Sequence, residues 1–260
     1  MQNRYAGDIG DYSKFVLMKH LFEDKDIGIV WYLYPDETHN KDGLHIEYGK
    51  YGLTDSVKEI LKNVANSKNR NIDTLMEALY KEGYLDGNRI KEFKDLVSVG
   101  ENMQERCEHR TKWHKRAQEA VKGCPVVFVD PDNGLVKMEC YGNGHKKSGK
   151  YIFFHEAGEF FEDAKVLIIY QHFPRKKHIE FIEERLEDIK REIPGDYGLY
   201  AIKFNKVSPR VYFVLVEKDA KKEFEKNLKE FFESDFSRSK DGHVFAAYDA
   251  EGRQLYPQSV

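Results

Sequence analysis

Residues 124–134 read Cys-Pro-Val-Val-Phe-Val-Asp-Pro-Asp-Asn-Gly, a short apolar run that ends in a polar turn. A run of this kind, rich in β-branched and aromatic residues, is typical of a strand that is buried on both faces. Two other runs have the same form, Ile-Val-Trp-Tyr-Leu-Tyr-Pro at 29–35 and Lys-Val-Leu-Ile-Ile-Tyr-Gln-His-Phe at 165–173. Because amphipathic patterns separate these runs, the sequence predicts a mostly parallel sheet with helices on both faces.

The segments around these strands predict the rest of the fold. Helical periodicity is present at 12–24, 155–164, 175–193 and 221–234. An antiparallel strand pair is expected around the turn Val207-Ser208-Pro209, and a short hairpin at the end of the chain. Residues 54–122 read as helices at 55–65, 72–84, 88–99 and 104–123. We therefore predict one α/β domain over 1–260, with a three-layer Rossmann-like sheet and a helical insertion at 54–122.

Composition limits the classes of function. The chain has 42 Lys and Arg against 45 Asp and Glu, a net charge of −3, so it lacks the basic total of a strong, sequence-blind nucleic-acid binder. It has no apolar run long enough to span a membrane and no hydrophobic signal core at its start. Its three cysteines lack the spacing of a disulfide framework or a zinc site. We expect a cytoplasmic protein without a membrane partner.

Polar side chains follow each of the three apolar runs. In an open α/β sheet, ligands bind beyond the carboxyl ends of the strands. Buried carboxylates are costly unless donors, a cation or a ligand pairs with them, so function explains such groups well. The alternative is that each segment is a polar turn that ends its strand, for which Pro-Asp-Asn-Gly is favourable. The candidates are Asp36, Glu37, His39, Asp42 and Gly43 after the first run, Asp130, Asp132 and Asn133 after the second, and Gln171, His172 and Arg175 after the third.

The opening segment, Ala-Gly-Asp-Ile-Gly-Asp-Tyr-Ser-Lys at 6–14, predicts a glycine-containing turn that enters a helix. Its backbone N–H groups could face an anion, and Asp11 could equally be the helix N-cap. Lys14 lies in the first helical turn, where the helix dipole disfavours a cation. This position indicates a nearby anion, either the carboxylate of a ligand or a neighbouring Asp.

Basic residues cluster locally and are candidates for contact with nucleic acid. Trp113 lies among basic residues, as a base-stacking surface requires, although solvated helix faces have the same composition. His109 and His114 lie five residues apart, which is not a metal-ligand spacing, and we read both as surface residues. The nucleic-acid candidates are Arg110, Trp113, Arg116, Lys146, Lys147 and Arg175.

The order of these segments resembles that of bacterial ribosomal RNA adenine-N6 methyltransferases that act on the large subunit. Residues 5–21 resemble that family's opening, where a Gly-Asn-x-x-Asp-x-x-Lys-His-like signature precedes a helix. Residues 35–43 fall where the family carries Asp-Thr-His and a glycine-rich loop, and 130–133 where it has Asp-Pro-Pro-Tyr. The strand at 165–173 matches a later strand that ends Trp-Tyr-Pro, and the family also inserts helices between its first two motifs.

The resemblance implies a class I methyltransferase-like fold and S-adenosylmethionine as cofactor. Two motifs depart from the family. Only Gly43 remains in the glycine-rich loop, whose glycines let the backbone approach the cofactor. Asp132 and Asn133 replace the second proline and the aromatic residue that stacks on a flipped adenine.

The first functional hypothesis is a methyltransferase that acts on RNA, DNA or a nucleotide. Asp130 would accept from an amino group, Asp36 or Asp42 would bind the cofactor ribose, and Lys14 its carboxylate. The catalytic candidates are Asp130, Asp132, Asn133 and His172, and the cofactor-binding candidates are Lys14, Asp36, Glu37, His39, Asp42 and Gly43.

Two alternatives remain open. A phosphodiesterase or nuclease would hold Mg²⁺ or Mn²⁺ through carboxylates, which hard cations prefer. A non-catalytic adaptor would keep the fold and bind nucleic acid through the insertion. Under either enzymatic hypothesis we expect Asp130→Asn to abolish activity without lowering the melting temperature, because a buried charge is removed. The candidate metal ligands are Asp8, Asp11, Asp36, Asp130 and Asp132.

Overall fold

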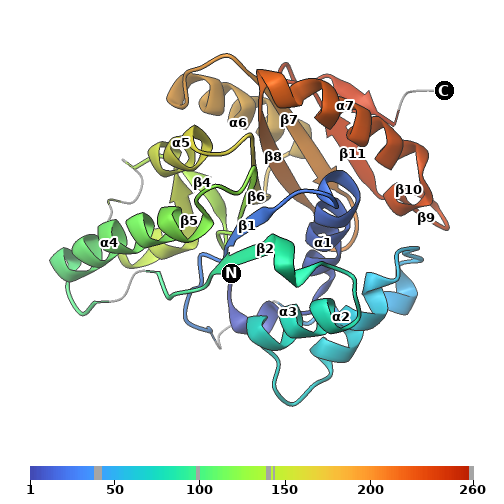
Figure 1. The fold of residues 1–260 in the computed structure, drawn as a ribbon, viewed down its shortest axis with the longest axis horizontal. Coiled ribbons are helices and arrows are strands. Elements are labelled where there is room, and N and C mark those ends of the chain that lie inside the picture. Colours follow the sequence, from blue (N-terminus) through green and yellow to red (C-terminus); the bar gives the residue numbers. More distant parts are fainter. Residues whose placement is uncertain (38–42, 98–99, 139–141, 143, 258–260) are drawn as a thin grey trace.

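The computed structural model describes residues 1–37, 43–97, 100–138, 142 and 144–257. A mixed eight-stranded sheet forms its centre, in the order β12-β11-β7-β8-β6-β3-β1-β2 (Figure 1). The strands of this sheet are β1 (Ile27–Val30), β2 (Ile90–Phe93), β3 (Val126–Val129), β6 (Val166–His172), β7 (Tyr197–Phe204), β8 (Arg210–Glu217), β11 (Phe245–Tyr248) and β12 (Gln254–Tyr256).

Strand direction determines which ends of the strands meet. β2, β1, β3 and β6 are mutually parallel neighbours, whereas β8 is antiparallel to both β6 and β7. Because β8 runs against β6, its first residue, Arg210, pairs with the last residue of β6, His172. The start of β8 therefore lies at the same edge of the sheet as the carboxyl ends of β1, β3 and β6.

Helices cover both faces of the sheet, and two apolar cores separate the three layers. Side chains of α1, α2, α3 and α7 pack in one core, and those of α4, α5 and α6 in the other. Strand residues alternate between them, so that Phe128 points into the first core and Val127 and Val129 into the second. The helices are α1 (Ile9–Phe22), α2 (Val57–Ala65), α3 (Ile72–Lys81), α4 (Met103–Val121), α5 (Phe154–Glu162), α6 (His178–Glu192) and α7 (Lys218–Glu233).

Short elements complete the fold. β4 (Gly134–Val136) and β5 (Tyr151–Phe153) form a small parallel pair, and β9 (Arg238–Ser239) and β10 (Gly242–His243) an antiparallel one. The 3₁₀ turns are η1 (Asn3–Tyr5), η2 (Tyr48–Lys50), η3 (Gly87–Arg89), η4 (Lys146–Lys150) and η5 (Asp235–Ser237). Among the described residues, none of the helices has the length and apolar character that a membrane crossing requires.

The structure confirms the α/β class and the three-layer Rossmann-like arrangement, as well as the β7–β8 pair and the terminal β11–β12 hairpin. The helical reading of 54–122 is wrong in one part. Residues 90–93, expected in a helix, form edge strand β2, which pairs with β1. Helix α4 packs on β1 and β2. Within the described part of 54–122, α2 and α3 belong to the connection between β1 and β2 and pack in the same core as α1 and α7 (Figure 1).

Candidate functional site

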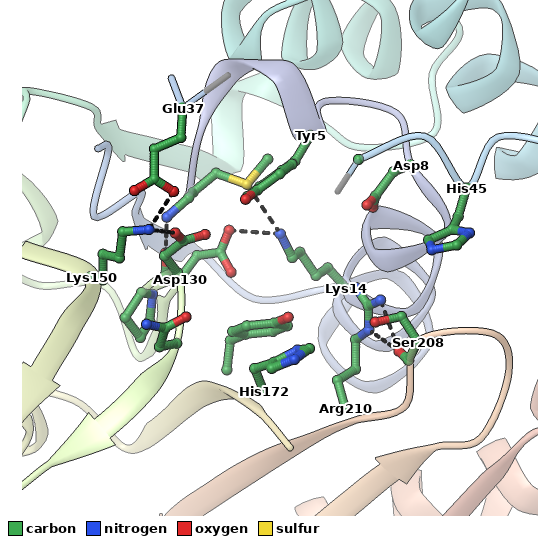
Figure 2. A pocket seen from close by; sticks show the side chains of 16 residues that line it. Tyr5, Asp8, Lys14, Glu37, His45, Asp130, Lys150, His172, Ser208 and Arg210 are labelled. Carbon is green, nitrogen blue, oxygen red and sulfur yellow. Dashed lines mark hydrogen bonds and ion pairs between the residues drawn. The ribbon is translucent and has the colours of Figure 1, made fainter. Parts of the chain in front are cut away.

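A cavity of about 270 Å³ opens at the edge of the sheet where β1, β3 and β6 end (Figure 2). Four carboxylate side chains line it, together with three basic side chains, two of Lys and one of Arg. This wall comes from segments far apart in the sequence: the N-terminal turn and α1, residues 37, 43 and 45, the turn at 130–133, Lys150, the end of β6, and the start of β8.

The start of α1 is shaped by glycine and aspartate. Gly7 has a φ of +79°, a conformation that favours glycine, and a Cβ there would lie 2.6 Å from the Leu61 carbonyl oxygen. Asp8 is the N-cap, since its carboxylate accepts from the Gly10 N–H at 2.7 Å. Asp11, which the sequence offered as a possible N-cap, lies inside the helix, three residues after the actual N-cap. The carboxylate of Asp11 instead accepts from the Gly7 N–H at 2.7 Å.

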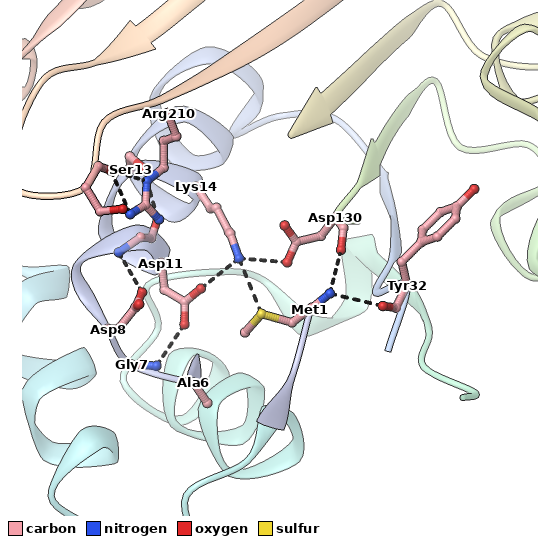
Figure 3. A network of polar contacts seen from close by, with 12 residues as sticks. Met1, Ala6, Gly7, Asp8, Asp11, Ser13, Lys14, Tyr32, Asp130 and Arg210 are labelled. Atoms are coloured by element: carbon pink, nitrogen blue, oxygen red, sulfur yellow. Dashed lines mark hydrogen bonds and ion pairs between the residues drawn. The ribbon is translucent and has the colours of Figure 1, made fainter. Parts of the chain in front are cut away.

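Lys14 lies between two buried carboxylates (Figure 3). Its Nζ atom is 2.9 Å from Asp11 Oδ1 and 2.7 Å from Asp130 Oδ2. Burial alone would lower the pKa of Lys14, but Asp11 and Asp130 raise it above its ordinary value. The ammonium group therefore stays charged, and the anion expected near Lys14 is a pair of aspartates.

Asp130 directly follows β3 and is only 1% exposed. Its Oδ2 atom accepts from Lys14, and its main-chain carbonyl accepts from the α-amino group of Met1 at 3.2 Å. Its Oδ1 atom has no hydrogen-bond partner within the described part of the chain. Asp130 thus brings an acceptor oxygen, held by a fixed cation, to the wall of the cavity.

A second ionic cluster closes another side of the cavity. Lys150 contacts both Glu37 and Asp132, with 3.5 Å from its Nζ atom to Asp132 Oδ2. Gln2 donates from Nε2 to both carboxylates, at 3.2 Å to Glu37 and 2.9 Å to Asp132. Burial alone would raise the pKa of Asp132, but the α-amino group of Met1, Gln2 and Lys150 together hold it below its ordinary value.

The lowered pKa of Asp132 predicts a specific response to acid. A carboxyl whose pKa is lowered on folding adds stability above its unfolded pKa, near 4, and this stability is lost as the pH falls through the folded pKa. Between about pH 5 and about pH 3, the wild type should therefore lose more unfolding free energy than Asp132→Asn. Urea unfolding at several pH values measures this, with exposed Asp73→Asn as control. Parallel curves for the wild type and Asp132→Asn would contradict the prediction.

The turn after Asp132 is held by the last residues of β6. Gln171 accepts from the Leu135 N–H at 2.8 Å and donates to the Asn133 carbonyl at 2.7 Å. Gly134, between them, has a φ of +107°, and a Cβ there would lie 2.3 Å from the Gln171 side chain. Gln171 is therefore a supporting residue of the turn, whereas Tyr170 and His172 line the cavity. Burial raises the pKa of Tyr170 to about 12, which keeps its hydroxyl protonated.

Most of the predicted site residues meet in this cavity, while some lie elsewhere. Asp36 is exposed and accepts from the Arg4 N–H at 3.2 Å, outside the cavity wall. His39 and Asp42 fall outside the described residues. The predicted residues that line the cavity are Asp8, Lys14, Glu37, Gly43, Asp130, Asp132, Asn133 and His172.

The candidate metal ligands do not form a metal centre. Among the residues that the structure describes, no group of three or more His, Cys, Asp or Glu side chains is placed to hold a metal ion. Asp11 and Asp130 share Lys14, Asp132 pairs with Lys150, and Asp8 caps α1. A divalent cation would have to displace these lysines, so the donor set does not fit Mg²⁺ or Mn²⁺.

Two of the predicted nucleic-acid contacts are wrong, because their side chains are buried. Arg110 is completely inaccessible and forms a bidentate pair with Glu156, with both distances 2.7 Å. Trp113 is also fully buried and donates to the Asp95 carbonyl. His114, expected at the surface, is buried and bonds Glu159. The remaining candidates are exposed: Arg116, Lys146, Lys147 and Arg175.

The Arg110–Glu156 pair predicts a structural role for Arg110. Lysine cannot donate two parallel hydrogen bonds as arginine does, so Arg110→Lys should cost about 1.5–3 kcal/mol of unfolding free energy. Urea unfolding measures this loss. Arg116→Lys is the matched control on the same helix, since Arg116 pairs with Asp95 at the surface and should change stability by less than about 0.5 kcal/mol. Equal effects of the two substitutions would contradict the structural role.

The sequence reasoning missed several residues of the cavity wall. Lys150 and Arg210 carry charge into the cavity, and Tyr5, His45 and Ser208 complete its wall. One signal was available for Arg210. It opens the second strand of the predicted antiparallel pair, directly after the Val207-Ser208-Pro209 turn. Its position beside His172 follows from the pairing of β8 with β6. Comparison with protein-family models and with curated proteins finds no match to this chain.

Proposed function

We propose that this protein is a methyltransferase that uses S-adenosylmethionine to methylate an amino group of a nucleotide or a nucleic acid. The observation that carries the proposal is Asp130, whose carboxylate lies at the carboxyl end of β3 with Oδ2 fixed by Lys14 and Oδ1 unpaired among the described residues. An amino group that enters the cavity can donate to this oxygen, which orients the nitrogen for reaction.

The charges of the cavity suit this cofactor, which carries a sulfonium, an ammonium and one carboxylate. Asp8, Glu37, Asp130 and Asp132 face Lys14, Lys150 and Arg210, so the lining has one more negative than positive side chain. Glu37 and Asp132 would accept from ribose hydroxyl groups, as acidic residues at strand ends do in nucleotide-binding sheets. In this proposal Lys14 positions Asp130 and does not bind the cofactor carboxylate, because its ammonium group already contacts the carboxylates of Asp11 and Asp130.

S-adenosylmethionine, when bound, would supply a methyl group and retain the electron pair of the broken carbon–sulfur bond on sulfur. Asp130 would accept one N–H of the attacking amino group and then take up or pass on the proton that the nitrogen loses. Lys14 would hold the Asp130 carboxylate in place through its 2.7 Å contact with Oδ2, which leaves Oδ1 directed at the incoming amino group. Tyr170, which stays protonated, would contribute a neutral wall.

Thermal shift and methyl transfer together test the proposal. At about 100-fold excess over its Kd, S-adenosylhomocysteine should raise the melting temperature by roughly 5–10 °C. Transfer of a radiolabelled methyl group to RNA, DNA or nucleoside monophosphates should then identify the acceptor. Stabilisation by Mn²⁺ alone would favour a nuclease instead. Silence with both ligands, alongside salt-sensitive nucleic-acid binding, would favour an adaptor.

A further inference from the structure

Arg210 is a buried cation in the wall of the cavity (Figure 2). It is the first residue of β8, lies next to His172 on β6, and is only 4% exposed. In a buried site a charge costs free energy unless a partner of opposite charge or several hydrogen bonds compensate it. The contacts of this guanidinium group therefore indicate what else the cavity binds.

The contacts of Arg210 leave much of its donor capacity unused. Nε and Nη2 both donate to one acceptor, the Ser208 carbonyl, at 3.0 and 2.9 Å. No carboxylate among the described residues lies within 4.0 Å of the guanidinium nitrogens, unlike Lys14 and Lys150, which both have ion-pair partners. A guanidinium group has five N–H donors in a planar fork that matches an oxyanion.

The start of α1 leaves room for this side chain. A Cβ on Gly10 would lie 1.6 Å from Arg210 Nη1, so glycine is needed there for the guanidinium to pass the helix. Asp8, the nearby carboxylate, is already engaged with the Gly10 N–H. Burial alone would lower the pKa of Arg210, but Tyr170, Asp8, Tyr212 and Asp11 raise it, and the group remains charged.

We propose that Arg210 forms an oxyanion subsite of this cavity that binds a phosphate group of the nucleotide or nucleic-acid substrate. The choice of phosphate rests on the proposed function, whereas the need for an oxyanion rests on Arg210 alone. The side chains of Ser208 and His45 line the same end of the cavity and can donate to the remaining phosphate oxygens. A nucleotide would then lie between Arg210 at its phosphate and Asp130 at its amino group.

The first test compares nucleotides with nucleosides on the wild-type protein, by calorimetry and without any methyl donor. Adenosine 5′-monophosphate and cytidine 5′-monophosphate should bind at least about tenfold more tightly than adenosine and cytidine, the expected effect of a charge-assisted hydrogen bond. Equal affinities would overturn the proposal. Because no methyl transfer is measured, the subsite can stand even if the protein proves not to be a methyltransferase.

The second test uses variants of Arg210. Arg210→Gln should bring nucleotide affinity to within about twofold of nucleoside affinity. Arg210→Lys keeps the charge but loses the planar fork of donors, so its preference for nucleotides over nucleosides should lie between that of Arg210→Gln and that of the wild type. Arg253→Gln, at the exposed β11–β12 turn, is the matched control and should keep the full difference. A nucleotide preference that survives in Arg210→Gln would overturn the proposal.

A third arm separates substrate phosphate from cofactor carboxylate. S-adenosylhomocysteine carries a carboxylate, and methylthioadenosine lacks it. Arg210→Gln should weaken nucleotide binding while leaving the affinity ratio of these two compounds unchanged. If the substitution removes that ratio instead, Arg210 binds the cofactor carboxylate and the phosphate subsite is refuted. Melting temperatures of all variants check that each one is folded, and the wild-type comparison stands without them.

Discussion

Lys14→Met should lower the free energy of unfolding by about 3–5 kcal/mol at neutral pH, the usual effect of removing one partner from a buried ionic cluster. The substitution keeps the length of the side chain but leaves Asp11 and Asp130 buried together without the cation that lies within 2.9 Å of each. Two like charges would then share a site from which water is excluded. Urea unfolding of the wild type and the variant measures the loss.

The loss should shrink in acid. Burial already raises the pKa of Asp11 above its ordinary value, against the opposing effect of Lys14. Without Lys14 this pKa should rise further, so the destabilisation is present at high pH and fades as Asp11 takes up a proton. Lys19→Met, on the same helix, removes an exposed pair with Glu23 and should cost less than about 1 kcal/mol at any pH. A loss for Lys14→Met no larger than this control would show that Lys14 does not hold the site together.

The fold was largely predictable because its strands and helices carry strong local patterns. Long apolar runs predicted β1, β3, β6, β7 and β8. The boundaries of the first were wrong, because β1 covers 27–30 and shares only residues 29 and 30 with the run at 29–35. Strand β2 was missed for a physical reason. Its residues Ile-Lys-Glu-Phe include two good helix formers, and four residues at a sheet edge fit a helical period as well as an alternating one. Only its pairing with β1 makes this segment a strand.

The site was predictable where a strand end determines it. The rule that ligands bind at the carboxyl ends of parallel strands located Asp130, Asp132, Asn133 and His172 correctly at one cavity. This rule does not locate Lys150. Lys150 contacts Glu37 because it directly precedes β5, which pairs with β4. That pair joins residues 134–136 to residues 151–153, a long-range pairing that no local pattern in the sequence indicates.

Basic residues on a helix were the least reliable indicator of nucleic-acid contacts. The sequence places Arg110 among charged residues, and nothing local distinguishes it from Arg116, which is exposed. The difference is Glu156, which lies 46 positions away on α5 and receives the buried guanidinium group. Burial is set by the packing of α4 on the sheet and α5, a long-range property that a pattern of charges does not contain.

Asp130→Asn should lower kcat/KM for methyl transfer by about 10²–10⁴-fold, the range for loss of a positioned proton acceptor. Asparagine presents a neutral oxygen and an N–H₂ group, so it can no longer hold and deprotonate an amino group. The contact with Lys14 also reverses our sequence-based expectation about stability. Removing the Asp130 charge leaves Lys14 with Asp11 alone, and the melting temperature should fall. A methyl-transfer assay at saturating donor, with unfolding curves, measures both effects.

Asp11→Asn is the matched control, because it takes one carboxylate from the same buried lysine but keeps Asp130. Its loss of stability should resemble that of Asp130→Asn, while its kcat/KM should fall by less than about tenfold, since the acceptor oxygen remains. Equal losses of activity in the two variants would mean that Asp130 acts only as a partner of Lys14. If Asp130→Asn keeps its activity and still melts at a lower temperature, Asp130 is structural and the acceptor of the amino group lies elsewhere in the cavity.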